Sequence, residues 1–481
     1  MSASIPSDQQ QAAIETVAGL MRRARAAQEI FAGYTQAQVD EVVLGVAWTL
    51  MEPANNRRLS EQAVSDTGIG DVDDKIIKNH RKTLGLLRDL KQAQTVGIIA
   101  DKPEQGLVEI ARPIGVVGAV VPSTNPVATP FNNVLNALKC ANAIILAPSP
   151  KGQGVCNELI LLIHAVLDKL GAPRDLVQML PMPINKANSY ELMRQVDLIV
   201  VTGSQNNVRA CYSSGTPALG VGSGNVPSII DDSADLADAA QKVMASKTFD
   251  NATSCSSENS LIVLDAVYDD MMAAMEQAGA RMLDAAEKQQ LQSVLWDEHG
   301  HLSRHVIAQK ASRIVDVAGF QRDALQGDTV RCLMVEESGW GVDYPYSDEK
   351  LSPVLAVYRA TDFDHACDIA EGILRFKGQG HSLSIHTQDD QHVSHLGEKL
   401  PVCRVIVNQA HTFATGGSFN NGMPFSLSMG CGSWGGNSID DNLNYRHFMN
   451  TTKIVRTIEP NEPTLDEIFG EYWEKQGIAG A

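Results

Sequence analysis

The 481-residue sequence predicts an α/β fold in which parallel β-sheets are covered by helices on both faces. From residue 114 onward, short apolar segments of strand length alternate with segments of helical period, a pattern typical of parallel sheets. The chain is also longer than one hydrophobic core normally supports, so we expect two or three domains. Two apolar segments joined by a turn at 96–113 lie outside this alternation and predict a β-hairpin.

The elements follow one another in a regular order. Residues 8 to about 93 show helical periodicity only, with breaks at Pro53 and at the turn 67–70. The alternation then predicts strand 114–121, helix 129–140, strand 143–147, helix 152–170, strand 176–180, helix 187–195 and strand 198–203. A second strand-and-helix unit begins near residue 229. Residues 451–458 predict one more strand, which we expect to pair with the 96–113 hairpin of a neighbouring subunit.

Composition excludes several classes of partner. The chain has 57 acidic and 39 basic residues, a net charge of -18, which argues against a nucleic-acid surface but allows a local pocket of either sign. The sequence has no apolar run of membrane-spanning length and no signal-peptide pattern at its start. Its eight cysteines form no Cys-x-x-Cys motif and no cluster with histidine. We therefore expect a cytoplasmic protein with no metal site and no membrane contact.

Cys255 is the outstanding candidate for chemistry. It lies in the segment 249–259 (FDNATSCSSEN), after a helical pattern at 232–247 and before an apolar strand at 260–265. A thiol on such a loop can face a cleft, whereas most free cysteines are buried packing residues. We predict that Cys255 is a nucleophile and that the other seven cysteines pack in the interior.

Polar and glycine-rich loops follow the predicted strands at 122–126, 147–150, 202–204 and 220–225. In open parallel sheets, ligands bind at the carboxyl ends of the strands. The sequence Thr-Gly-Ser at 202–204 ends a strand and opens a helix, so its backbone amides suit a phosphate group, although Thr-Gly-Ser is also common turn chemistry. The placement of these loops on consecutive strands predicts one shared ligand site.

Six segments together resemble the aldehyde dehydrogenase superfamily over nearly the whole chain and, more narrowly, its CoA-acylating branch. They are 122–126 (PSTNP), 202–204 (TGS), 220–225 (GVGSGN), 247–251 (KTFDN), 349–353 (EKLSP) and 430–436 (GCGSWGG). The resemblance implies an aldehyde-dehydrogenase-like fold with a dinucleotide-binding domain at 1–226, including an oligomerisation hairpin at about 96–113. It further implies a catalytic domain at 227–430 that carries the cysteine, and a return segment with an oligomerisation strand at 431–481.

The resemblance implies NAD or NADP as cofactor. It assigns cofactor contacts to Thr202, Gly203, Ser204, Gly222, Ser149, Lys151 and Glu349, the last of these at the nicotinamide ribose. Hydrolytic members of the superfamily have a Lys and a Glu on the adenosine ribose where this sequence has Ala147 and Pro150. Loss of that Glu removes a repulsion against a 2′-phosphate, and Lys151 adjoins the position, so NADP is allowed beside NAD.

A missing carboxylate implies coenzyme A as co-substrate. Hydrolytic members carry a Glu that activates water, but residues 219–222 contain none, so a thioester on Cys255 would persist until CoA takes the acyl group. By resemblance, the Asn125 amide and the Cys255 backbone N–H hold the oxyanion. His381, with a near-neutral pKa expected for histidine, either assists deprotonation of the CoA thiol or is a satisfied core residue.

Segments 251–259 and 407–417 resemble acylating sulfoacetaldehyde dehydrogenases. This implies a small anionic aldehyde, and we expect His411, Thr253 and Ser256 to contact its sulfonate. Acetaldehyde and succinate semialdehyde remain alternative substrates. A hydrolytic dehydrogenase, a reductase of acyl phosphates and a non-enzymatic scaffold remain alternative functions. The hairpin and the late strand predict a homodimer or homotetramer, because exposed strand edges tend to be covered.

Overall fold

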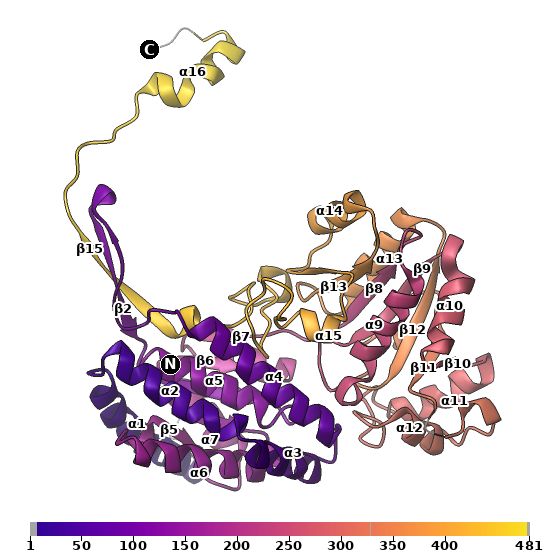
Figure 1. Cartoon of the computed structure of the whole chain (residues 1–481), viewed down its shortest axis with the longest axis horizontal. Coiled ribbons are helices and arrows are strands. Elements are labelled where there is room, and N and C mark those ends of the chain that lie inside the picture. The colour runs from indigo at the N-terminus through magenta and orange to yellow at the C-terminus, as the bar shows by residue number, and fades with distance from the viewer. Residues whose placement is uncertain (1–6, 328, 479–481) are drawn as a thin grey trace.

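Two parallel β-sheets, each flanked by helices, form the body of the protein, and a small antiparallel sheet extends from it (Figure 1). The structure is a computed structural model that describes residues 7–327 and 329–478. The predicted α/β class is confirmed. Within these residues no helix combines the length and apolar character needed to cross a lipid bilayer.

The first sheet has the strand order β5-β4-β3-β6-β7, with every neighbouring pair parallel. Its strands are β3 (Val116–Val121), β4 (Ala143–Pro148), β5 (Val177–Met179), β6 (Leu198–Val201) and β7 (Ala218–Gly220). All residues of β3 and β4 are buried, as expected for apolar strands covered on both faces. The helices of this region are α5 (Ala128–Lys139), α6 (Gln153–Lys169), α7 (Lys186–Gln195) and α8 (Gln205–Tyr212).

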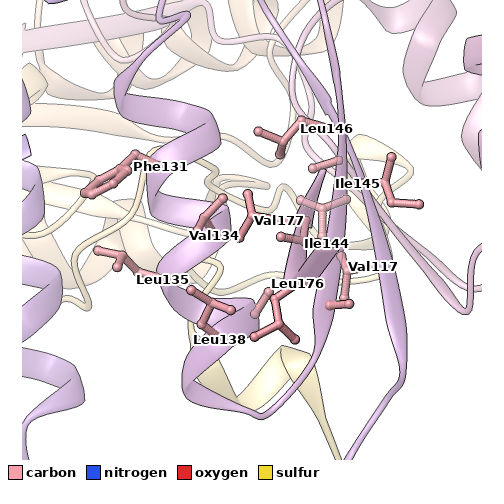
Figure 2. Packing of buried hydrophobic residues seen from close by; sticks show 14 of the residues in the cluster. Val117, Phe131, Val134, Leu135, Leu138, Ile144, Ile145, Leu146, Leu176 and Val177 are labelled. Carbon is pink, nitrogen blue, oxygen red and sulfur yellow. The ribbon is translucent and has the colours of Figure 1, made fainter. Parts of the chain in front are cut away.

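Helix α5 shows how the sheet is covered. Figure 2 shows Val134 and Leu138 of α5 on the side that faces the residues of β3, β4 and β5, with Phe131 and Leu135 on the other side of the helix. Every residue of α5 is buried, because further helices pack on its outer side. These are the N-terminal helices α2 (Gln36–Met51) and α4 (Val72–Leu90), while α1 (Asp8–Phe31) packs on α7 and α3 (Pro53–Thr67) packs on α4. The predicted break at Pro53 falls at the first residue of α3, where proline needs no N–H partner.

The second sheet has the order β10-β11-β12-β9-β8-β13-β14 and is also parallel. Its strands are β8 (Val226–Ile230), β9 (Glu258–Leu264), β10 (Ala280–Met282), β11 (Cys332–Glu336), β12 (Val354–Ala360), β13 (Leu383–His386) and β14 (Val405–Val407). The accompanying helices are α9 (Leu236–Thr248), α10 (Tyr268–Gln277), α11 (Ala285–Leu295), α12 (Ala311–Ala318), α13 (Phe363–Phe376), α14 (Asp390–Lys399) and α15 (His411–Ala414). The domain limits at residues 226 and 430 stay predictions.

The third sheet is antiparallel and differs from the prediction in the strand that β15 (Met449–Val455) pairs with. The hairpin is present as β1 (Gly97–Lys102) and β2 (Leu107–Pro113), and β15 completes the order β1-β2-β15. The prediction that the late strand pairs with a neighbouring subunit's hairpin is wrong, because β15 pairs antiparallel with β2 of its own chain from Met449 to Val455. Beyond it, α16 (Leu465–Gln476) stands away from the body and buries no residue (Figure 1).

Candidate active site

A cavity of about 720 Å³ lies between the two parallel sheets, a size suited to small-molecule and cofactor binding. One wall comes from loops at the carboxyl ends of the first sheet, and the other from the segment that precedes β9 at the amino edge of the second sheet. Ten predicted site residues line this cavity: Asn125, Ser149, Thr202, Gly203, Ser204, Gly222, Thr253, Cys255, Ser256 and Glu349. Lys151, His381 and His411 are absent from the lining.

The Cys255 loop has an unusual backbone. After α9 ends at Thr248, Asp250, Asn251 and Ala252 have φ angles of 49°, 52° and 60°, in the left-handed region that non-glycine residues rarely occupy. The glycine-rich loop approaches closely from the other side, since a Cβ at Gly224 would lie 1.8 Å from the Cys255 carbonyl oxygen. This path carries the chain from the end of α9 to the half-buried Cys255 at the cavity wall.

A buried charge cluster holds that backbone in place. The Asp250 carboxylate accepts hydrogen bonds from Lys75 Nζ at 3.0 Å and from Lys78 Nζ at 2.5 Å, both on α4. The Asp71 amide donates to the same carboxylate at 2.8 Å, and the Asp250 amide donates to Asp74. Burial alone would raise the pKa of Asp250, but Lys78 and Lys75 outweigh burial and lower it below its ordinary value. Asp250 is therefore a carboxylate that fastens the Cys255 loop to α4.

Lys78 also orients the predicted oxyanion donor. Its Nζ donates to Asn125 Oδ1 at 2.8 Å and to Thr253 Oγ1 at 3.1 Å. Because the Asn125 oxygen accepts from Lys78, the Nδ2 group remains as the donor available to a ligand. The Thr253 hydroxyl donates to Asp250 at 2.8 Å, so Thr253 is engaged in the same cluster although it lines the cavity.

The Cys255 thiol is protonated at rest. Burial raises its pKa to about 12, and Glu349 and Cys431 add to the shift, while its own amide and Arg404 oppose it. Glu349 lines the same cavity, and burial raises the pKa of its carboxyl to about 7. A group with this pKa can accept a proton near neutrality, so Glu349 offers a base within the cavity in addition to its predicted ribose contact.

The cofactor side fits a phosphate-bearing ligand. Strand β6 ends at Val201 and Ser204 caps α8, accepting from the Asn207 amide, so the predicted strand-to-helix turn at 202–204 is present. Within the described chain, the Gly203 and Ser204 amides donate to no other residue. Gly222 packs against Cys431, whose Sγ would lie 2.8 Å from a Cβ at that glycine. Cys431 itself is buried and lies outside the lining.

Lys151 and the two histidines lie elsewhere than expected. The Lys151 side chain is exposed beside the cavity. His381 is enclosed, with Nδ1 against Ser382 Oγ at 2.6 Å and a buried Nε2 that has no partner in the described residues. Burial lowers its pKa well below the ordinary value, so the ring is neutral, and its role toward CoA stays a prediction.

The prediction that His411 contacts the substrate is wrong. Its ring is fully buried, with Nδ1 bonded to the Ser256 carbonyl at 2.7 Å and Nε2 near Thr415 Oγ1 at 3.2 Å. Burial lowers its pKa to about 4, so it is neutral and carries no charge for an anion. Thr412 and Phe413, the next residues of α15, face the cavity instead.

Sequence reasoning missed the basic wall of the cavity. Lys78, Arg81 and Lys82 of α4 all line it, at the i, i+3, i+4 spacing that places side chains on one helix face. Lys186 is a fourth basic residue in the lining, whereas Glu349 is the one carboxylate found there in the described part of the chain. The sequence shows the spacing of Lys75, Lys78 and Lys82 on one helix face, but it does not show that this face borders a cavity.

Comparison of the sequence with known proteins finds a matching family model and relatives that cover most of the chain. The model of the aldehyde dehydrogenase family matches residues 3–426. The chain is 56% identical over 477 residues, 99% of its length and 96% of the other protein, to a sulfoacetaldehyde dehydrogenase (acylating) of Cupriavidus necator. It is 37% identical over 453 residues, 94% of this chain and 98% of the relative, to a succinate-semialdehyde dehydrogenase (acetylating) of Clostridium kluyveri.

A solved structure shares the architecture. An acetylating aldehyde dehydrogenase from Geobacillus thermoglucosidasius superposes with a TM-score of 0.90 at 34% sequence identity. The alignment covers 95% of this chain and the whole of that one, so the two chains share one overall fold.

Proposed function

The chain belongs to the aldehyde dehydrogenase family, and from this premise we propose that it is a CoA-acylating sulfoacetaldehyde dehydrogenase that uses NAD or NADP. The observation that carries the proposal is the lining of the cavity. Cys255 and Asn125 face it together, whereas the lining residues Val221 and Gly222, in the segment where hydrolytic members carry a general base, bring no carboxylate. An acyl group on Cys255 is then available to a second thiol.

The proposed reaction passes through a thioester on Cys255, and residues of this chain act in the steps before and after it. The Cys255 thiolate attacks the aldehyde carbon and forms a C–S bond, while the thiol proton passes to a base such as Glu349. Asn125 Nδ2 and the Cys255 amide stabilise the oxyanion, and the amide makes no other hydrogen bond in the described residues. NAD(P), when bound, supplies the acceptor for the hydride. Oxidation leaves a thioester on Cys255, which the CoA thiolate attacks, releasing acyl-CoA and the cysteine thiolate.

The cofactor site is assigned to the loops of the first sheet. The free amides at the start of α8, beside Thr202 and Ser204, fit a pyrophosphate, and Ser149 and Gly222 complete the wall. Lys151 would meet a 2′-phosphate only at the exposed edge of this site.

We infer a cytoplasmic homo-oligomer. All eight cysteines are free thiols, which fits a reducing compartment. Strand β15 exposes Ile454 and Val455, and α16 exposes Ile468 and Tyr472 without contacting the body of its own chain. Such apolar surface on an extended arm suits burial against another copy, as a homodimer or homotetramer.

One assay matrix tests the function. Reduction of NAD or NADP is followed with and without CoA for sulfoacetaldehyde, acetaldehyde and succinate semialdehyde. We expect sulfoacetaldehyde oxidation to require CoA and to yield the acyl-CoA, and Cys255→Ala to abolish it. Free acid formed without CoA would indicate the hydrolytic reaction, and a requirement for phosphate would indicate an acyl-phosphate reductase; either result overturns the proposal.

A further inference from the structure

Two cations that α4 contributes to the cavity wall have no carboxylate partner among the described residues. Lys82 Nζ donates to the main-chain carbonyls of Gly416 at 2.6 Å and Ser426 at 3.0 Å. Arg81 Nη2 donates to the Phe413 carbonyl at 3.2 Å and to Ser418 Oγ at 2.7 Å. In a chain with a net charge of -18, uncompensated positive charge inside a cavity is costly unless a ligand neutralises it.

We propose that Arg81 and Lys82 form the subsite that holds the substrate's sulfonate beside Cys255, and so determine the choice of aldehyde. This inference rests on the proposed function and adds the residues that give it selectivity. It also replaces His411, which is neutral and enclosed, as the source of anion recognition.

Both side chains keep donors for a ligand. An ammonium has three N–H donors and the carbonyls of Gly416 and Ser426 occupy two, which leaves the third for an anion. The Arg81 Nε–H is buried and has no acceptor in the described chain. A sulfonate has three oxygens and a permanent negative charge, so it can accept from both cations through charge-assisted hydrogen bonds.

Aromatic rings fix the position of the guanidinium. Arg81 Cζ lies 5.5 Å from the centroid of the Phe413 ring and 5.3 Å from that of Phe419, so the charge is held between two rings. Phe413 and Phe249 also line the cavity and pack at a centroid distance of 4.6 Å. Their apolar surface offers contact for the single methylene that separates the aldehyde carbon from the sulfur.

The subsite lies near the nucleophile, as so short a substrate requires. Cys255 lines the same cavity as both cations. Phe413, whose carbonyl accepts from Arg81, follows Thr412, whose hydroxyl donates to the Ser256 carbonyl next to Cys255. Lys78 is excluded from this role because its ammonium is already bonded to Asp250, Asn125 and Thr253. Lys78 therefore holds the Cys255 loop in place, whereas Arg81 and Lys82 remain available to the ligand.

The test compares sulfoacetaldehyde with propionaldehyde, a neutral aldehyde in which a methyl group replaces the sulfonate, in the CoA-dependent assay. In Arg81→Gln and Lys82→Met, we expect the ratio of kcat/KM for sulfoacetaldehyde to that for propionaldehyde to fall at least tenfold. Arg88→Gln is the matched control, because Arg88 lies on the same helix and also contacts Ser418 and Phe419 but does not line the cavity. Its ratio should be unchanged.

A ratio within twofold of wild type in both subsite variants overturns the inference, whether absolute rates are kept or lost. A binding measurement covers variants that fold poorly: ethanesulfonate should inhibit propionaldehyde oxidation by the unmodified enzyme at least tenfold more tightly than ethyl methyl sulfone, its neutral analogue. Equal inhibition also overturns the inference. If the unmodified enzyme binds ethanesulfonate yet forms no acyl-CoA from sulfoacetaldehyde, the proposed function fails while the anion subsite stands.

Discussion

Two successive pairs of basic residues on one face of α4 have different roles at the cavity. Lys75 and Lys78 of α4 are neutralised by Asp250 and hold the Cys255 loop, whereas Arg81 and Lys82 meet only carbonyl and hydroxyl oxygens of the described chain. A basic residue of α4 thus has a structural role where a carboxylate lies opposite it. Where no carboxylate lies opposite, the basic residue remains available to bind a ligand. The decisive feature is the partner on the opposing loop, and the charge of the helix alone does not reveal it.

The largest effect should come from removing that partner. Asp250→Ala leaves two lysines buried without a carboxylate, and breaking such a pair costs on the order of 3–5 kcal/mol. We expect this loss in the free energy of unfolding measured by urea titration. Asp175→Ala is the control, since its pair with Arg23 has side chains 43% and 54% exposed and should contribute below about 1 kcal/mol. Equal stabilities of the two variants would contradict a structural role for Asp250.

Substitution of Lys78 should slow every aldehyde alike. Lys78→Met removes the hydrogen bond that orients the Asn125 amide, and loss of one oxyanion donor typically lowers kcat by about 10²–10³-fold. The measurement is kcat for sulfoacetaldehyde and for propionaldehyde. Both should fall by a similar factor, in contrast to the selective loss expected for Arg81→Gln. A loss confined to the anionic aldehyde would place Lys78 in the subsite and erase the distinction drawn along α4.

Much of the scaffold could be predicted because local pattern determines it. The run 143–147 is wholly apolar and became the buried β4, and the turn at 202–204 became the cap of α8. Strand β15 was also expected, but periodicity identifies a strand without naming its partner, which proved to be β2 of the same chain.

The wall of the cavity could not be predicted in the same way. A basic helix face is normally solvated, and α4 faces the cavity only because Asp250, 172 residues from Lys78 in sequence, fastens the Cys255 loop to it. The prediction that His411 contacts the substrate was wrong for a related reason. The position of His411 after a strand suggested the cavity, but α15 begins there and turns the ring toward the Ser256 carbonyl. Both outcomes depend on contacts between distant segments, which a single sequence does not report.

The smallest effect is a pH dependence confined to the anionic substrate. Burial, with help from Arg81 and Lys78, lowers the pKa of Lys82 to about 7, against an opposing effect of Cys255. Lys82 is therefore a cation below pH 7 and loses its charge as the pH rises through this value, while the sulfonate stays ionised throughout. Affinity for sulfoacetaldehyde should accordingly fall between pH 6 and pH 9.

We expect its KM to rise about tenfold over that range, since hydrogen bonds to charged groups exceed neutral ones by about 1 kcal/mol or more. Arg81, a guanidinium, keeps its charge across this range, so binding is weakened and not lost. Titration of Glu349 affects both aldehydes, so the ratio of the KM values for sulfoacetaldehyde and propionaldehyde isolates Lys82. In Lys82→Met this ratio should be high and independent of pH. A ratio that still rises with pH in that variant would assign the titration to another group and leave Arg81 as the one anion contact on α4.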